Sequence, residues 1–214
     1  SSIRWEGDSN PVLINDPRFS PAGVLAPKSK ADLAFTMHML SWLSTIGTAA
    51  IVEFPGVLYR GGAEQKIRKY LIDNNYVDAV IQLPPDLFFG TTIATCIIVL
   101  KKSKADNAVL FIDASAEFVR GGNKNKLSEA NREKILDAYV ARRDIDHFAR
   151  LVPKKDIAEN EYNIAVSSYV EQNNETEKVD IKKLNAHIAE IVIRQQKLRE
   201  AIDEIVADLE GGAA

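Results

Sequence analysis

The residues of this chain that are best suited to chemistry lie in one short stretch, residues 83–102. A proline pair leads into Phe88-Phe89, the turn residues Gly90-Thr91-Thr92 follow, and an uninterrupted apolar run occupies residues 95–100. An apolar run without alternation is typical of a strand buried on both faces, so the aromatic pair is expected at the edge of a sheet. A ring in that position is poorly solvated unless it meets a partner, and a flat nucleobase is one candidate partner.

A second concentration of functional side chains is basic. Residues 119–143 contain seven lysines and arginines against three acids, although the whole chain carries a net charge of −3. The excess has two interpretations, an ordinary solvated surface or a contact with a phosphate backbone. Because the chain as a whole is slightly acidic, any nucleic-acid contact must come from such a local patch. The candidate DNA contacts are Arg120, Lys124 and Lys126.

The remaining reactive residue types form no recognisable catalytic or metal-binding group. Cys96 is the only cysteine and lies in the apolar run, which excludes a disulfide framework and predicts a small buried side chain in a reducing compartment. Asp113 ends a predicted strand, but one carboxylate does not define a site. Gly61-Gly62 predicts a turn and a helix cap rather than a phosphate-binding loop. No metal site is predicted, because the histidines are scattered along the chain: His38, His147 and His187.

Four apolar stretches are predicted to form the sheet that positions these residues. A buried helix is expected over 30–45 and an amphipathic helix over 63–75. The stretch at 95–102 follows its predecessor after too few residues for a parallel crossover, so it is expected to run antiparallel. This order of elements predicts an α/β fold with an open mixed sheet. The predicted strands are 47–55, 77–84, 95–102 and 108–115.

The last part of the chain is predicted to be mainly helical. Ser128 is a candidate N-cap for a helix over 127–143, residues 150–170 look irregular, and the polar residues 172–180 indicate a linker. From residue 181 onward, apolar side chains recur at alternating spacings of three and four, which is the heptad pattern of a coiled coil. So narrow a stripe predicts docking against a partner helix through Ile181, Leu184, Ile188, Ile191, Leu198, Ile202, Ile205 and Leu209.

Composition sets outer limits on these expectations. The hydrophobic share of 46% supports a folded core, and no apolar run approaches the ~18 residues that a membrane span needs. The first 27 residues are loop-like, because four prolines interrupt every periodicity. Ordered loops of that length are uncommon inside compact domains. The chain is therefore expected to be a fragment of a longer protein.

Together, these stretches resemble the C-terminal part of the modification subunit of type I restriction–modification enzymes, a DNA adenine-N6 methyltransferase. The resemblance runs in order from residue 1 to about residue 170. It is specific, because several independent strings occur in the family's order. They are NDPRF at 15–19, APKSKADLAF at 26–35, FPGVLYRGGAEQKIRKYLI at 54–72, VDAVIQLPPDLFFGTTIATCIIVLKK at 77–102, LFIDAS at 110–115 and NEYNIAVSSYV at 160–170.

The resemblance implies the C-terminal half of a Rossmann-like methyltransferase sheet and a role for Phe89. In related enzymes an aromatic residue, six positions before the small residue that opens the seventh strand, stacks on the flipped adenine. Counting back from Thr95 gives Phe89, and Phe88 would then pack in the core. The resemblance also implies S-adenosylmethionine as the cofactor of the complete enzyme. The family's glycine-rich and Asn-Pro-Pro-aromatic motifs do not occur in this sequence, so this chain alone is expected to bind no cofactor and to be inactive.

The resemblance suggests three parts and several partners. Residues 1–116 would be part of the catalytic domain, 117–171 a helical or irregular extension, and 172–214 a linker with a long coiled-coil-like helix. The specificity and restriction subunits and double-stranded DNA are the implied partners, and the location is expected to be cytoplasmic. Self-association is expected through the edge of the 47–55 strand or through the heptad stripe. The alternative is a non-catalytic assembly module that docks partner helices.

Overall fold

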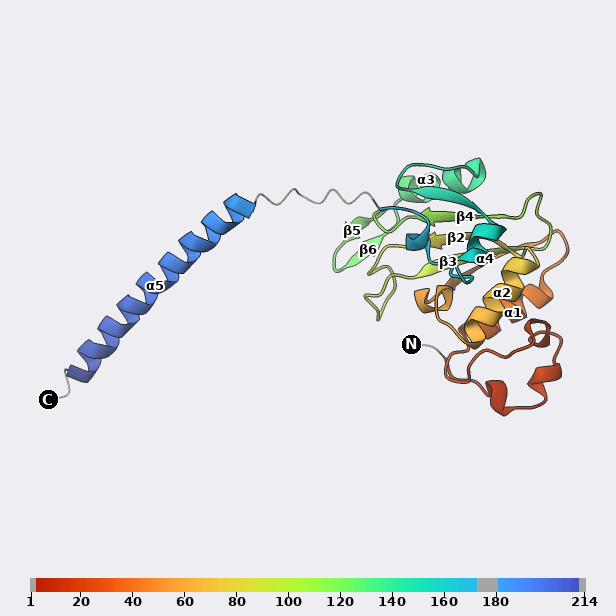
Figure 1. Cartoon of the computed structure of the whole chain (residues 1–214), viewed down its shortest axis with the longest axis horizontal. Coiled ribbons are helices and arrows are strands. Elements are labelled where there is room, and N and C mark those ends of the chain that lie inside the picture. Colours follow the sequence, from red (N-terminus) through yellow and green to blue (C-terminus); the bar gives the residue numbers. More distant parts are fainter. Residues whose placement is uncertain (1–2, 173–180, 212–214) are drawn as a thin grey trace. The chain divides into compact units, whose positions relative to one another are not determined.

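The computed structural model describes residues 3–172 and 181–211. The chain divides into two compact units, Ser1–Gln172 and Asn173–Ala214, which are treated separately below (Figure 1). The predicted linker at 172–180 lies almost wholly outside the described residues. None of the described helices is both long enough and apolar enough to cross a membrane.

A five-stranded mixed sheet forms the centre of the first unit, in the order β1-β3-β2-β4-β7. Strand β3 runs antiparallel to both of its neighbours, which confirms the sequence prediction, while β2 and β4 are parallel. The sequence analysis predicted one antiparallel strand, at 95–102; β7, which it did not predict, also runs antiparallel, against β4. The strands are β1 Thr48–Glu53, β2 Val77–Gln82, β3 Cys96–Lys101, β4 Ala108–Asp113 and β7 Ala149–Pro153.

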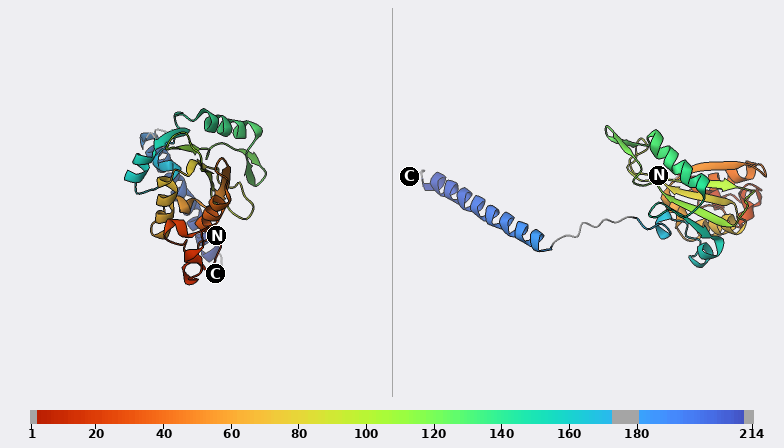
Figure 2. Two further views of the ribbon diagram at one scale, coloured as in Figure 1. Left: turned by 90° about the vertical axis from the view of Figure 1, so that its right-hand side faces the viewer. Right: turned by 90° about the horizontal axis from the view of Figure 1, so that it is seen from above.

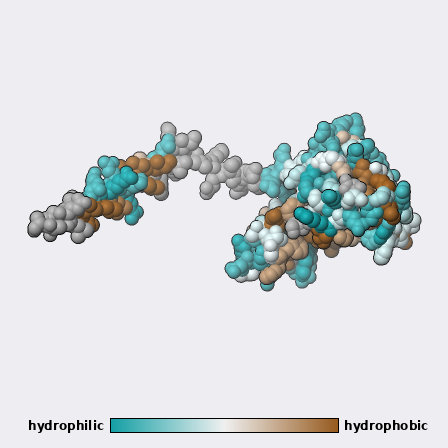
Figure 3. Space-filling model, turned by 90° about the horizontal axis from the view of Figure 1, so that it is seen from below, coloured by the Kyte–Doolittle hydropathy of each residue, from teal (hydrophilic) through white to brown (hydrophobic). Residues whose placement is uncertain are grey.

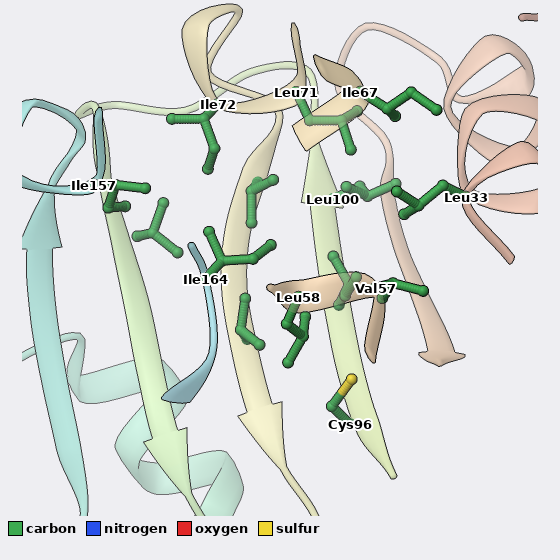
Figure 4. Close-up of a cluster of buried hydrophobic side chains, with 14 of the residues drawn as sticks. Leu33, Val57, Leu58, Ile67, Leu71, Ile72, Cys96, Leu100, Ile157 and Ile164 are labelled. Atoms are coloured by element: carbon green, nitrogen blue, oxygen red, sulfur yellow. The ribbon is translucent and has the colours of Figure 1, made fainter. Parts of the chain in front are cut away.

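Helices cover both faces of this sheet, as the opposed positions of α3 and of α1, α2 and α4 in Figure 2 show. One core contains side chains from α1, α2 and α4, and Figure 4 shows it packed against the strands. The other core contains side chains from α3. The helices of this unit are α1 Asp32–Trp42, α2 Ala63–Asp73, α3 Glu129–Ala141 and α4 Lys154–Glu159.

Two predictions about the start of the domain need correction. Helix α1 is not buried all round, because Phe35 is 49% exposed and Trp42 is 79% exposed. Strand β1 is not a core strand: it lies at the end of the sheet, and its residues alternate in exposure before the buried Glu53. The apolar composition of both segments was correctly recognised. Composition alone does not reveal which side of an element lacks a neighbour.

The proline-rich lead is ordered over the described residues. It contains three short 3-10 turns, Gly7–Ser9, Leu13–Asn15 and Ser20–Ala22. The indole of Trp5 anchors it by donating to the carbonyls of Ala26 and Pro27. Two further 3-10 turns span Pro55–Leu58 and Val166–Ser168.

Residues after the fourth strand contain elements that the sequence analysis did not predict. A small hairpin pairs β5, Val119–Gly121, with β6, Lys124–Lys126. Helix α3 follows, and Ser128 caps it as predicted, in a capping box with Asn131. Strand β7 then adds to the sheet from a region that looks irregular in sequence. Its sequence contains no apolar run long enough to predict a strand, and only two of its five residues are buried.

The second unit contains helix α5, Ile181–Gly211. A helix of that length spans roughly 45 Å. Figure 3 shows hydrophobic surface along the helix. The described side chains of the predicted stripe are about half exposed: Ile188, Ile191, Leu198, Ile202 and Ile205. The side chains of Ile181, Leu184 and Leu209, which complete the predicted stripe, lie outside the described residues.

Candidate nucleic-acid interface

The loop that joins β2 to β3, residues 83–95, carries the predicted base-stacking residue, and we call it the Phe89 loop. It lies at the end of the sheet at which β2 finishes and β3 starts. The Phe89 side chain is fully exposed, at 101% of its reference area, so its ring is free to meet a partner. Phe88 is 41% exposed, so the expectation that it packs in the core was wrong.

The conformation of the loop explains why both rings are accessible. Asp86 and Gly90 have positive φ angles, +58° and +77°, and the amide of Asp86 donates to the carbonyl of Thr92. The segment between them is therefore a turn rather than extended backbone. The rule that neighbouring side chains of a strand face opposite sides does not apply there.

Hairpin β5–β6 packs against this loop through several hydrogen bonds. The backbone amide of Asn125 donates to the carbonyl of Asp86 at 3.1 Å, and its side-chain amide donates to the carbonyl of Pro85 at 2.8 Å. The ammonium group of Lys124 donates to the carbonyl of Thr91 at 2.9 Å and lies 3.4 Å from the carboxylate of Asp86. The structure thus joins two segments that are separated by about thirty residues in sequence.

The three predicted basic contacts consequently lie next to the Phe89 loop, although they differ in exposure. Lys126 is exposed, and the Arg120 side chain is 62% exposed with a guanidinium nitrogen 3.9 Å from Asp86. Lys124 is less accessible, at 32%. Asp86 and Asn125 complete the arrangement and were missed by the sequence analysis, because nothing in the local sequence indicates that these two segments meet.

A buried carboxylic acid lies at the same edge of the sheet, at the end of β1. Glu53 pairs in register with Cys96, and its carboxylate accepts a 2.7 Å hydrogen bond from the hydroxyl of Thr36. Burial raises the pKa of Glu53 to about 7, against the hydrogen bond from Thr36, which lowers it. Burial also raises the pKa of the Cys96 thiol to about 12, so Cys96 is an unreactive core residue, as predicted.

The other residues that the sequence analysis considered have structural roles. Gly62 has a φ of +71° and caps the start of α2, so Gly61-Gly62 forms the predicted turn. A 3-10 turn separates this pair from β1, so the glycines do not form the direct strand-to-helix loop that grips a phosphate. Asp113 is buried and accepts from the amide of Ser115 and the side chain of Gln172.

No described cluster of His, Cys, Asp and Glu side chains is arranged to bind a metal ion.

Comparison with known proteins places the chain among DNA methylases. Residues 1–178 match the family model described as N-6 DNA Methylase. The sequence is 51% identical to the type I restriction enzyme MpnII methylase subunit of Mycoplasma pneumoniae, over 97% of this chain and 38% of the relative. It is 36% identical to the MjaVII methylase subunit of Methanocaldococcus jannaschii, over 88% of this chain and 33% of that protein.

Solved structures give the same result. The methyltransferase subunit of a type I restriction–modification system from Streptococcus thermophilus superimposes with a TM-score of 0.77 at 48% identity, over 79% of this chain and 36% of that one. The EcoKI M protein shares the fold at 16% identity, with a TM-score of 0.58 over 88% of this chain and 45% of that one. The chain spans less than two fifths of the length of the curated relatives named above. Because the family model covers most of the chain, the resemblance to modification subunits is confirmed, and this protein belongs to the N-6 DNA Methylase family.

Proposed function

We propose that this chain supplies the target-base side of a DNA adenine-N6 methyltransferase of the type I restriction–modification class. The observation that carries the proposal is the fully exposed ring of Phe89, on a turn held at the edge of the sheet. A base extruded from a duplex loses its stacking neighbours, and an aromatic ring in the receiving site offsets part of that loss. An exposed aromatic ring on an ordered turn is unfavourable without such a partner.

The charge around Phe89 supports contact with DNA rather than with an apolar ligand. Arg120 and Lys126 are exposed on the adjoining hairpin, and Lys124 adds a third positive charge. Lysine and arginine near a flipping site attract the phosphate backbone without reading sequence. In this proposal the DNA sequence is read by a separate specificity subunit.

The proposed reaction is transfer of a methyl group to the exocyclic amine of adenine, with S-adenosylmethionine as the methyl donor. The residues of this chain position the base by stacking, which brings the amine to a fixed place. We propose that the cofactor is held by residues outside this chain. We also propose that residues 1–116 complete one half of a Rossmann-like sheet and that residues 117–171 form an extension of it, which carries hairpin β5–β6.

The terminal helix has a separate role in this proposal. Its half-exposed apolar side chains at heptad positions favour a coiled-coil contact with helices of the specificity subunit, within a cytoplasmic complex that also contains the restriction subunit. The same observation supports the second candidate function, a non-catalytic module that only docks partner helices. The two differ in whether the Phe89 loop matters for methyl transfer.

Replacement of the ring tests the proposal in a complete methyltransferase that carries this sequence. Phe89→Ala is expected to reduce turnover about tenfold or more, because stacking is worth about 1–3 kcal/mol per base, while the affinity for S-adenosylmethionine stays nearly unchanged. Phe89→Tyr keeps an aromatic ring and should retain most of the turnover. With 2-aminopurine at the target position, quenching of the flipped base should be lost in the alanine variant alone. An equal loss of cofactor affinity would place Phe89 in a structural role, and unchanged turnover would favour the docking module.

A further inference from the structure

The exposed ring of Phe89 is not held in place by packing against neighbouring side chains. Since the side chain is fully exposed, only the backbone of the loop determines where the ring lies. The base of the loop closes through a 2.9 Å bond from the amide of Leu83 to the carbonyl of Thr95. Nearer the ring, the bond from the amide of Asp86 to the carbonyl of Thr92 is longer, at 3.3 Å, and it spans a turn with two positive φ angles. That bond alone is weak support for a group that must meet a base in a fixed orientation.

Hairpin β5–β6 supplies the missing support from both flanks of the turn. On the flank before Phe89, Asn125 binds the carbonyls of Pro85 and Asp86 with its side chain and its backbone. On the flank after Phe89, the ammonium of Lys124 binds the carbonyl of Thr91. The same ammonium reaches back to the carboxylate of Asp86, so one group spans the turn.

Asn125 is buried more deeply than the other residues of the hairpin. Asn125 is 3% exposed, which is unusual for an amide side chain on a short surface hairpin. Arg120, which pairs with Asn125 across the hairpin, has a side chain that is 62% exposed. Lys124 and Asn125 therefore hold the loop through hydrogen bonds, whereas Arg120 reaches it only through a 3.9 Å ion pair with Asp86 and stays more accessible.

We infer that Lys124 and Asn125 are positioning residues for Phe89: the hairpin holds both flanks of the Phe89 loop and so fixes the place at which the ring meets the base. This inference rests on the proposed function and deepens it. In this inference Lys124 binds the Phe89 loop and not a DNA phosphate. Removal of its charge therefore changes activity by loosening the position of the Phe89 ring. Lys126 and Arg120 keep the role of backbone contacts.

A nitroxide label at position 89 tests the mechanical part of this inference on the chain as it exists, without DNA or cofactor. The label is attached to Phe89→Cys, and Cys96 stays unmodified because it is fully buried with a pKa raised to about 12. Lys124→Gln and Asn125→Ala are each expected to sharpen the electron paramagnetic resonance line shape, which reports faster motion of the turn. Lys126→Gln removes the same charge from the same hairpin and is expected to leave the line shape unchanged. Far-UV circular dichroism establishes that each variant is folded.

The functional part is tested in a complete methyltransferase that carries this sequence. Lys124→Gln is expected to lower kcat about tenfold, as loss of orientation does, with the KM for S-adenosylmethionine unchanged and activity restored in Lys124→Arg. The slope of log affinity for DNA against log salt should stay the same in Lys124→Gln. It should fall by about 0.9 in Lys126→Gln, because that variant loses one phosphate contact.

The possible outcomes separate the inference from the proposed function. An unchanged line shape in both Lys124→Gln and Asn125→Ala would show that the hairpin does not hold the Phe89 loop. The proposed role of Phe89 would be unaffected. A smaller salt slope in Lys124→Gln, with kcat unchanged at saturating DNA, overturns the positioning role in favour of a phosphate contact. If Phe89→Ala itself leaves turnover unchanged, the proposed function fails, whatever the line shapes show.

Discussion

Glu53 shows how a single buried group makes the stability of this fold depend on pH. Its pKa is raised from 4.5 to about 7, chiefly because burial removes water from the carboxylate. The folded state therefore keeps a proton over a pH range in which the unfolded chain releases it. Stability is expected to be highest below pH 4.5 as far as this group is concerned, to fall as the pH rises toward 7, and to stay low above that.

The test at this scale is Glu53→Gln, which removes the titration but keeps an oxygen to accept from Thr36. The variant is expected to be more stable than the parent at pH 8, by up to about 3 kcal/mol, and nearly equal at about pH 4. Urea unfolding at the two pH values measures both differences. A parent protein and variant with the same pH dependence would mean that the carboxylate of Glu53 reaches water in the folded state.

A second prediction concerns Asp78, which is buried at the start of β2 and faces two cations and a phenol. Lys101 and Arg142 each lie about 3 Å from its carboxylate oxygens, and the hydroxyl of Tyr139 donates to it at 2.6 Å. Removing the carboxylate leaves Lys101 without this counter-charge, while Arg142 keeps a second one, Asp106, at 3.0 Å. Asp78→Ala is therefore expected to cost about 3 kcal/mol in unfolding free energy.

Tyr139→Phe removes one donor only and should cost about 1–3 kcal/mol. Val140→Ala, on the exposed side of the same helix, is the matched control and should change stability by less than about 0.5 kcal/mol. The three variants are compared by denaturant unfolding. A loss in Val140→Ala as large as that in Tyr139→Phe would show that the helix, rather than the ion pair, determines the result.

At the scale of elements, the sequence predicted those parts whose structure is locally encoded. The apolar runs of β2, β3 and β4 were recognised because each is buried on both faces, and the Ser128 cap was recognised from residue type and position. The antiparallel direction of β3 followed from the short connection before it.

Elements held by contacts distant in sequence were missed or misjudged. Hairpin β5–β6 consists of three-residue strands whose pairing with the Phe89 loop leaves no periodic signal. Strand β7 exposes Arg150 and contains Pro153, so its sequence does not read as a strand. The candidate site was therefore predicted as two separate parts, the ring and the basic residues. Their meeting depends on hydrogen bonds of Asn125 and Asp86, and no local sequence pattern indicates these bonds.

At the scale of the molecule, self-association of the chain is expected by one of two routes. The apolar side chains of α5 are exposed, and β1 is an edge strand with one unpaired side. Ile191→Ser combined with Ile202→Ser should reduce the sedimentation coefficient if the helix is responsible, whereas Glu200→Ser on another side of the helix should not. Val52→Lys should reduce the sedimentation coefficient if the edge of β1 is responsible. A monomeric parent chain at tens of micromolar would exclude both routes.

The strand order of the sheet also has a consequence for how the chain acquires its structure. Strand β3 lies between β1 and β2, yet both of them precede it in sequence, and Thr48 is paired with Lys101. Neither earlier strand can find its permanent neighbour on a ribosome until residue 101 has emerged. The β1–β3 ladder therefore joins residues that lie far apart in sequence, whereas β2 pairs with β3 across a short loop. The long separation slows formation of the β1–β3 ladder and leaves the apolar segment of β1 open to chaperones in the meantime.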